Sequence, residues 1–232
     1  MKNVLVTMAI GDYARWGEEL TLPHIRAYAE KYGMDFVLVD QLRRHVSTYA
    51  DHVWTMVEVY YELLEVYDRM LSVPVDTWVK PNARNILELP PGIFYGMDEL
   101  PCDVSPENWH YGKGVWAYAH EMWPDEFGQK PLKREECPPH LYNTGPMLVD
   151  RYHRKLFKPP SREPGHGMME MALVNFRLHK SGMQHADLRP SWFNAANMWF
   201  ADQPVPDFLH CMWSHPNPKE EIVRAFMPRM GY

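Results

Sequence analysis

The sequence has 232 residues, which suits one globular domain, and 46% of them are hydrophobic and 23% charged. Its formal net charge of -6 argues against a nucleic-acid-binding surface. No apolar run reaches the roughly 18 residues that a membrane span needs. The amino terminus also lacks a signal-peptide pattern, so we expect a cytoplasmic protein without a membrane span.

The amino-terminal part of the chain predicts buried strands that alternate with helices. Short β-branched runs bounded by Gly, Pro or Asp indicate the strands, and apolar residues at three- and four-residue spacing indicate the helices. The predicted strands are residues 2–8, 34–40 and 69–75, and the predicted helices are residues 20–33 and 51–66. This order predicts an α/β fold with a mostly parallel sheet, in which ligands bind beyond the carboxyl ends of the strands.

The carboxyl-terminal part of the chain is less regular. Strands are predicted at residues 92–98 and 141–150, helices at residues 168–182 and 217–226, and a long loop at residues 99–140. The three cysteines are odd in number and form no C-x-x-C pair, which argues against a disulfide framework and a thiolate zinc site. They are Cys102, Cys137 and Cys211.

Four segments, taken in order, resemble the nucleotide-sugar glycosyltransferases of the GT-A fold, in particular the glycogenin-like and galactosyltransferase-like branches. The segments are residues 6–40, residues 61–89 with "YDRMLSVPVDTWVKPNARN", residues 141–151 with "LYNTGPMLVDR", and residues 208–213 with "FLHCMW". The likeness is good over residues 3–98, loose over residues 140–226, and absent in the loop between them.

The resemblance implies a single GT-A-like domain with a mostly parallel central sheet, flanking helices and a small antiparallel part. Residues 1–98 would form the nucleotide-binding half and residues 99–232 the acceptor-side half. The implied activity is transfer of a hexosyl or pentosyl group from a nucleotide sugar, a UDP-sugar above all, to a hydroxyl group of a carbohydrate or glycoconjugate acceptor.

The resemblance also implies a divalent metal site. In the family the third strand ends in Asp-x-Asp, which holds the metal against the donor diphosphate; here the triplet is Pro74-Val75-Asp76, so the first carboxylate is replaced. We expect Asp76 and His210 to hold Mn²⁺, or Mg²⁺, because a hard cation neutralises the leaving diphosphate and one imidazole ligand favours Mn²⁺. The alternatives are a turn cap for Asp76 and an ordinary core histidine for His210.

Further residues are predicted to contact the donor. Those on the first strand-to-helix loop would hold the base and ribose, with an ordinary turn as the alternative, and those of the Asn-x-Gly strand would contact the sugar, with a glycine-marked bulge as the alternative. Asp98 is predicted as a donor-sugar contact. The loop residues are Thr7, Ala9, Gly11 and Tyr13, and the strand residues are Asn143 and Gly145.

Glu170 is the predicted catalytic carboxylate, at the start of a helix that follows a Gly-rich loop. It would act as a general base in an inverting enzyme, or by positioning and electrostatics in a retaining one; a solvated carboxylate favoured by the helix dipole is the alternative. Aromatic residues in 108–123 suggest an acceptor platform or core lining.

Two other functions fit the sequence. Pro74, and the absence of a lysine expected near residues 51–60, favour a nucleotide-sugar-binding subunit of the same fold without turnover. A metal-dependent hydrolase or nucleotidyltransferase on a different α/β fold would use the same His, Asp and Glu residue types.

Overall fold

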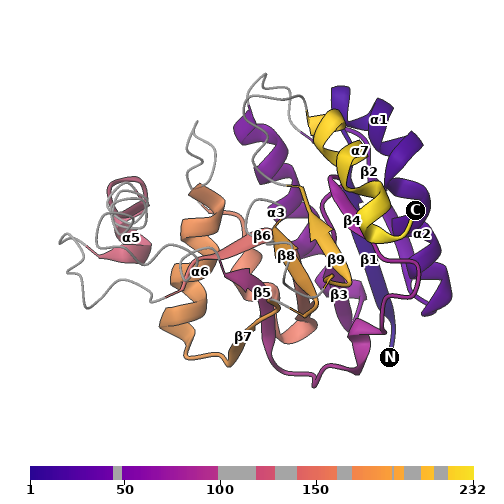
Figure 1. Ribbon diagram of the computed structural model, residues 1–232. Helices are drawn as coiled ribbons and strands as arrows, with labels where there is room; N and C mark the ends of the chain where they lie inside the picture. The colour runs from indigo at the N-terminus through magenta and orange to yellow at the C-terminus, as the bar shows by residue number, and fades with distance from the viewer. Residues whose placement is uncertain are drawn as a thin grey trace, which may run out of the picture.

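A six-stranded sheet lies at the centre of the computed structural model, which describes residues 1–43, 49–98, 119–128, 140–160, 169–189, 191–195, 205–211 and 219–232 (Figure 1). Its strand order is β2-β1-β3-β6-β5-β7. The strands are β1 (Asn3–Met8), β2 (Asp35–Val39), β3 (Arg69–Ser72), β5 (Phe94–Asp98), β6 (Tyr142–Asp150) and β7 (His185–Asp187).

The sheet is mostly parallel, as the sequence predicts. β1 runs parallel to β2 and β3, and β5 runs parallel to β7, whereas β6 is antiparallel to both of its neighbours, β3 and β5. The carboxyl ends of the other five strands therefore meet at one edge of the sheet, together with the start of β6. This is the edge where ligands of such sheets bind.

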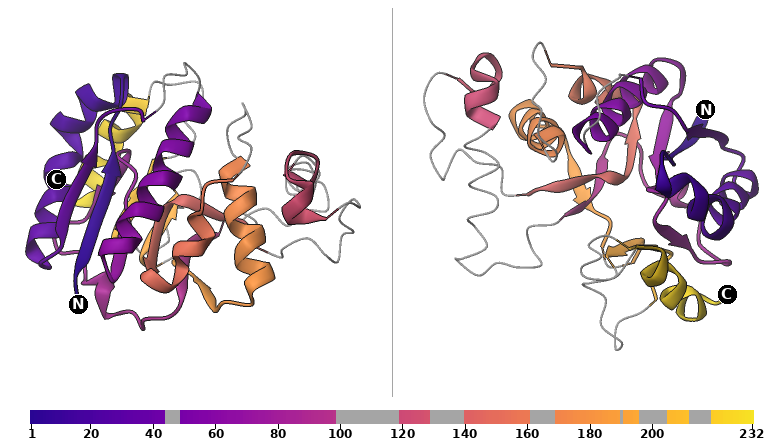
Figure 2. Two further views of the ribbon diagram at one scale, coloured as in Figure 1. Left: turned by 180° about the vertical axis from the view of Figure 1, so that it is seen from behind. Right: turned by 90° about the horizontal axis from the view of Figure 1, so that it is seen from above.

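Helices cover both faces of the sheet (Figure 2). On one face, α3 (Tyr49–Val66), the 3₁₀ helix η4 (Arg151–Phe157) and α6 (Met169–Ser181) bury Tyr60, Phe157 and Leu173 in one core cluster. On the other face, α2 (Leu22–Lys31) places Ile25 and Ala29 against the strand residues of a second cluster. Because α3 is sandwiched between the sheet and η4, it is apolar on most of its surface, as a helix in that position must be.

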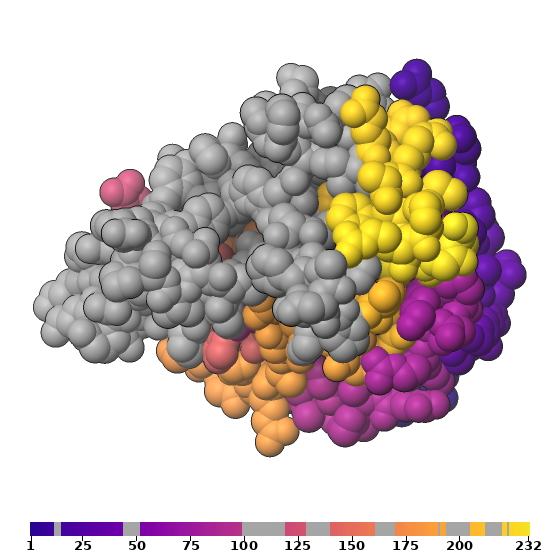
Figure 3. Space-filling view, in the orientation of Figure 1, coloured from indigo at the N-terminus to yellow at the C-terminus, as the bar shows by residue number. Residues whose placement is uncertain are grey.

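A small second sheet packs beside the α2 face. Its order is β4 (Thr77–Val79), β9 (Phe208–His210) and β8 (Phe193–Ala195), with β4 antiparallel to β9 and β8 parallel to it. α7 (Lys219–Met230) covers this sheet, where its Val223 carbonyl accepts a hydrogen bond from Trp78 Nε1 at 2.6 Å. α7 also lies on the outer surface next to α1 (Asp12–Leu20), to which Arg224 is joined by an ion pair with Glu19 (Figure 3).

Two short elements complete the described chain. The 3₁₀ helix η1 (Ile86–Glu88) follows β4, and α5 (Pro124–Phe127) packs on α6, where the rings of Phe127 and Phe176 stack with centroids 3.8 Å apart. In the described parts of the chain, every helix is too short or too polar to traverse a lipid bilayer.

Three local predictions differ from the structure. The segment after β1 is a loop only as far as Gly11, because α1 begins at Asp12, and this helix was not predicted. The third strand ends at Ser72 and not at residue 75, because Pro74 has no N–H to donate to a neighbouring strand and the chain turns at residues 75 and 76. The three strands of the small sheet were also not predicted individually; the sequence predicted only that the fold has a small antiparallel part.

Candidate functional site

Asp76 and His210 meet at the carboxyl edge of the sheet. The chain leaves β3, turns, and enters β4 at Thr77, which pairs with His210 at the end of β9. The Asp76 carbonyl accepts a hydrogen bond from the Cys211 N–H at 2.8 Å, which continues the pairing by one residue. The side chains therefore touch, with His210 Nε2 3.1 Å from Asp76 Oδ1, and they are only 7% and 6% exposed, respectively.

The position of β9 is fixed independently of that contact. Asp207, which precedes β9, accepts a hydrogen bond from Arg84 Nε at 2.6 Å, and its carbonyl accepts one from the Lys80 N–H at 2.9 Å. Arg84 also lies over the Trp192 ring, 4.2 Å from the centroid. His210 is thus held beside Asp76 by the backbone of the small sheet and by this arginine.

The donor set of this pair suits a hard cation with one nitrogen ligand. It offers carboxylate oxygens and an imidazole, and within the described part of the chain the second ring nitrogen of His210, Nδ1, is buried without a hydrogen-bond partner. No cluster of three or more His, Cys, Asp or Glu residues able to hold a metal occurs among the described residues. Among the described residues, Asp76 and His210 are therefore the two side chains that such a site would use.

Pro74 and Gly145 face each other where the first Asp of an Asp-x-Asp triplet would stand. A Cβ atom on Gly145 would lie 2.7 Å from Pro74 Cγ and 3.0 Å from Asn143 Oδ1, so only glycine fits. Asn143 Oδ1 accepts a hydrogen bond from the Gly145 N–H at 2.7 Å. The register between β5 and β6 shifts here, which shows that the glycine-marked bulge predicted as an alternative is present.

Glu170 lies on the opposite face of β6. Its Oε1 accepts a hydrogen bond from Thr144 Oγ1 at 3.2 Å, and the residue is 3% exposed. The buried Tyr60 hydroxyl contacts the Thr144 carbonyl at 3.2 Å, and desolvation, together with the charge of Glu170, raises the pKa of Tyr60. Side chains alternate across a strand, so Thr144 points toward α6, where Glu170 lies, while Asn143 and Gly145 face Pro74.

Asp98, the last residue of β5, is 1% exposed. Its Oδ2 lies 2.5 Å from His140 Nδ1, and its Oδ1 accepts a hydrogen bond from the Leu141 N–H at 3.2 Å. No role was predicted for His140 from the sequence, although it stands directly before the predicted strand at residues 141–150.

The four residues predicted to hold the base and ribose lie on different elements and differ in exposure. Thr7 belongs to β1 and is fully buried, and Ala9 is 1% exposed. Gly11 has a φ of 65°, a conformation that favours glycine, and nothing lies within 4 Å of a Cβ built there. Tyr13 belongs to α1, and its side chain is outside the described residues, as are residues 99–118 of the expected acceptor region.

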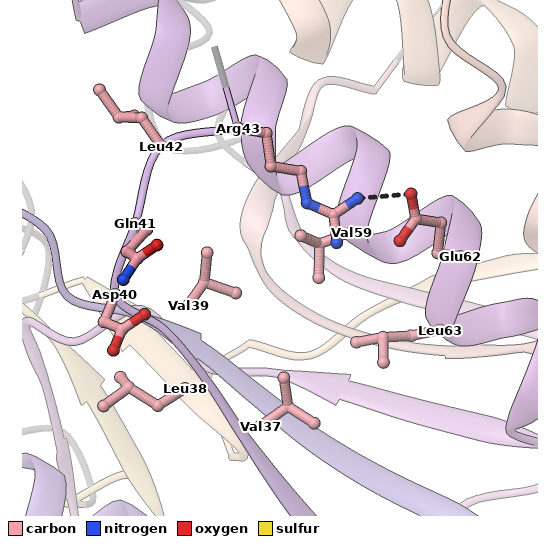
Figure 4. Close-up of a pocket in the computed structure, with 10 residues that line it drawn as sticks. All are labelled: Val37, Leu38, Val39, Asp40, Gln41, Leu42, Arg43, Val59, Glu62 and Leu63. Carbon is pink, nitrogen blue, oxygen red and sulfur yellow. Dashed lines mark hydrogen bonds and ion pairs between the residues drawn. The ribbon is translucent and has the colours of Figure 1, made fainter. Parts of the chain in front are cut away.

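A cavity of about 440 Å³ lies along the edge strand β2 on the side of α3 (Figure 4). Val37, Val39, Val59 and Leu63 line its apolar part, and Arg43 pairs with Glu62 at 2.5 Å at its rim. Asp76 and His210 are not among its lining residues.

No family model and no curated protein matches this sequence. Its structure is similar to that of a glycosyltransferase involved in the glycosylation of the major capsid of PBCV-1, with a TM-score of 0.65, 11% identity, and coverage of 97% of this chain and 100% of that chain. A mutant of Drosophila β1,4-galactosyltransferase 7 in complex with manganese, UDP-Gal and xylobiose aligns with a TM-score of 0.46, 13% identity, and coverage of 82% and 66%. The first of these comparisons shows that the chain has the predicted GT-A-type fold.

Proposed function

We propose that the chain is a metal-assisted glycosyltransferase that moves a hexosyl or pentosyl group from a UDP-sugar to a hydroxyl group of a carbohydrate or glycoconjugate acceptor. The observation that carries the proposal is the contact of Asp76 with His210 at the ligand-binding edge of a GT-A-type sheet. The hydrolase or nucleotidyltransferase alternative required a different α/β fold, which the structure does not have.

Asp76 and His210 are the residues that would hold Mn²⁺ or Mg²⁺. When bound, the cation would neutralise the charge that develops on the leaving diphosphate. The backbone of the segment around Gly11 would contact the nucleotide. Asn143 and Gly145, which lie beside Pro74, would contact the donor sugar. The fold supports this arrangement because the carboxyl ends of β1 and β3 and the start of β6 lie at one edge.

Calorimetric titration of the protein with UDP, in Mn²⁺ and again in chelator, tests the donor class. Binding is expected in Mn²⁺ and is expected to be lost in chelator. Incubation with UDP-glucose, UDP-galactose and UDP-xylose is then expected to release UDP from at least one of them. No binding of UDP under either condition would overturn the proposal.

The binding-subunit alternative gives a different result in the same experiments. Pro74 leaves the site with a single carboxylate, which favours binding without turnover. Metal-dependent binding of UDP, with no UDP released from any donor in the presence of mono- and disaccharide acceptors, would establish that alternative.

Glu170 is expected to act by positioning rather than by proton transfer, because it is 3% exposed and bonded to Thr144. Glu170→Gln keeps an oxygen that can accept the Thr144 hydrogen bond, so kcat is expected to stay within about tenfold of the wild-type value, whereas Glu170→Ala is expected to lose about 1–3 kcal/mol of stability. Steady-state kinetics and thermal unfolding measure the two effects, with Glu30→Gln on the exposed side of α2 as the control. A loss of several hundredfold in Glu170→Gln at unchanged Tm would instead make Glu170 the base.

A further inference from the structure

A second histidine–carboxylate pair, His140 with Asp98, has the geometry of a general base and its orienting group. The Nδ1 to Oδ2 distance is 2.5 Å, the Asp98 side chain is 1% exposed, and the His140 side chain is 40% exposed. An ionised carboxylate only accepts hydrogen bonds, so the proton of a neutral His140 lies on Nδ1 and the lone pair on Nε2. Among the described residues, the hydrogen bond of the His140 ring is made by Nδ1, and none is made by Nε2.

Neighbouring rings fix the orientation of His140. Its ring stacks on that of Tyr142, with centroids 5.6 Å apart and an interplanar angle of 18°, and the ring of His185 lies edge-on at 5.1 Å. The Tyr142 hydroxyl in turn bonds His185 Nδ1 at 2.9 Å. Gly96 makes room for this arrangement, because a Cβ there would lie 2.9 Å from Tyr142 Cβ.

The charges around His140 come from three strands. Asp98 on β5 contacts the ring directly, and Tyr142 on β6 is kept neutral because burial raises its pKa. On β7, burial lowers the pKa of His185 and raises that of Asp187, and Arg189 pairs with the Asp187 carboxylate at 2.7 Å. Asp98 is therefore the carboxylate in direct contact with the His140 ring.

This pair lies at the same edge of the sheet as Asp76. Met147 of β6 pairs with both Ser72 of β3 and Gly96 of β5, so these two residues lie at the same level of the sheet. Asp98 follows Gly96 by two residues and Asp76 follows Ser72 by four, both beyond that level toward the same edge. One strand, β6, lies between β3 and β5, so the two pairs stand two strands apart along this edge of the sheet.

We propose that His140 is the catalytic base that accepts the proton of the acceptor hydroxyl group, and that Asp98 is its positioning residue. The inference rests on the proposed function. The acceptor O–H bond breaks and its proton moves to Nε2, the acceptor oxygen forms the bond to the anomeric carbon, and the electron pair of the broken sugar–phosphate bond leaves on the nucleoside diphosphate. Asp98 thus has a role that differs from the predicted contact with the donor sugar.

The test measures the release of UDP in the presence of Mn²⁺. The donor is the one among UDP-glucose, UDP-galactose and UDP-xylose that the wild type consumes, and the acceptor is water or an added sugar. His140→Gln is expected to lower kcat about 100-fold, in the range of general-base catalysis, with little change in the donor KM. The wild-type rate is expected to rise with pH as the base loses its proton, and this acidic limb is expected to be absent from His140→Gln. Added imidazole is expected to restore activity to His140→Ala, which a purely structural histidine would not allow.

Two further variants complete the test. Asp98→Asn can keep its oxygen on the Leu141 N–H and turn its amide toward His140, which favours the wrong tautomer, so a similar loss of kcat is expected. His179→Gln, an exposed histidine of α6, is expected to behave as the wild type. Retained kcat and a retained acidic limb in His140→Gln would overturn this inference but not the proposed function. A loss of kcat in His140→Ala that imidazole does not restore would do the same. A wild type that consumes no donor would overturn the proposed function, and the inference with it.

Discussion

Replacing Asp76 with Asn is expected to weaken the metal-dependent binding of UDP strongly. Asp76 is the only carboxylate that contacts His210 among the described residues, so its loss removes the negative charge that would hold a divalent cation there. On the proposed function, such a cation would supply several kcal/mol of charge stabilisation, so its loss corresponds to a decrease of about 100- to 1000-fold in UDP affinity and in turnover. The Asn side chain has the same shape, so the small sheet is expected to fold unchanged.

Calorimetry of UDP binding in Mn²⁺ and in chelator measures this effect. Asp35→Asn is the matched control, because Asp35 is an exposed carboxylate at the amino end of β2, at the opposite edge of the same sheet. That variant is expected to bind UDP as the wild type does. Binding by Asp76→Asn that still depends on Mn²⁺ and is within about threefold of wild type would contradict the role of Asp76 as a metal ligand.

Gly145→Ala is expected to destabilise the fold and to weaken the metal site at the same time. The new Cβ would stand 2.7 Å from Pro74 Cγ, and a proline ring closed on the backbone can move this atom only by a change of ring pucker. Overpacking of this kind costs about 1–3 kcal/mol, and about 2–4 °C in Tm per kcal/mol for a chain of this size. Pro74 is two residues from Asp76, so a shift of the turn also displaces the carboxylate.

The Pro74→Ala change supplies the control for this prediction. Alanine at residue 74 lacks the Cγ atom that the new methyl group would meet, so the double variant Gly145→Ala/Pro74→Ala is expected to be more stable than the sum of the single effects predicts. Thermal unfolding of the four proteins gives this coupling energy. Additive effects would mean that the contact of Gly145 with Pro74 is not what excludes a side chain at residue 145.

Long periodic segments were predicted correctly because each one buries a continuous face. The apolar residues of segments 34–40 and 20–33 form a recognisable strand pattern and helix pattern, respectively, within the segment itself. The structure confirms the first as β2 and the second as α2. α1 was missed because Gly11 and Asp12 read as a turn, although they are the residue before the helix and its first residue. The three strands of the small sheet have three residues each, too few for a period to show.

The site was predictable only in part, for a related reason. Asp76 and His210 were placed together by the order of the segments that resemble GT-A enzymes, but their contact depends on the pairing of β4 with β9, which no local pattern encodes. His140 was missed because it precedes its strand and reaches Asp98 only through the pairing of Asp98 with Tyr142. Glycine at residue 145 was recognised, whereas its partner Pro74 was read only as a missing carboxylate.

The pairing of β4 with β9 also sets when the site can form during protein synthesis. Domains are made from the amino terminus onward at about 5–20 residues per second, and β9 contributes His210 long after Asp76 has left the ribosome. A growing chain therefore contains Asp76 long before it has a complete pair of cation ligands. On the proposed function, a nascent or prematurely terminated chain that lacks His210 would not bind the donor in a reactive arrangement. Such a chain would therefore not hydrolyse nucleotide sugars.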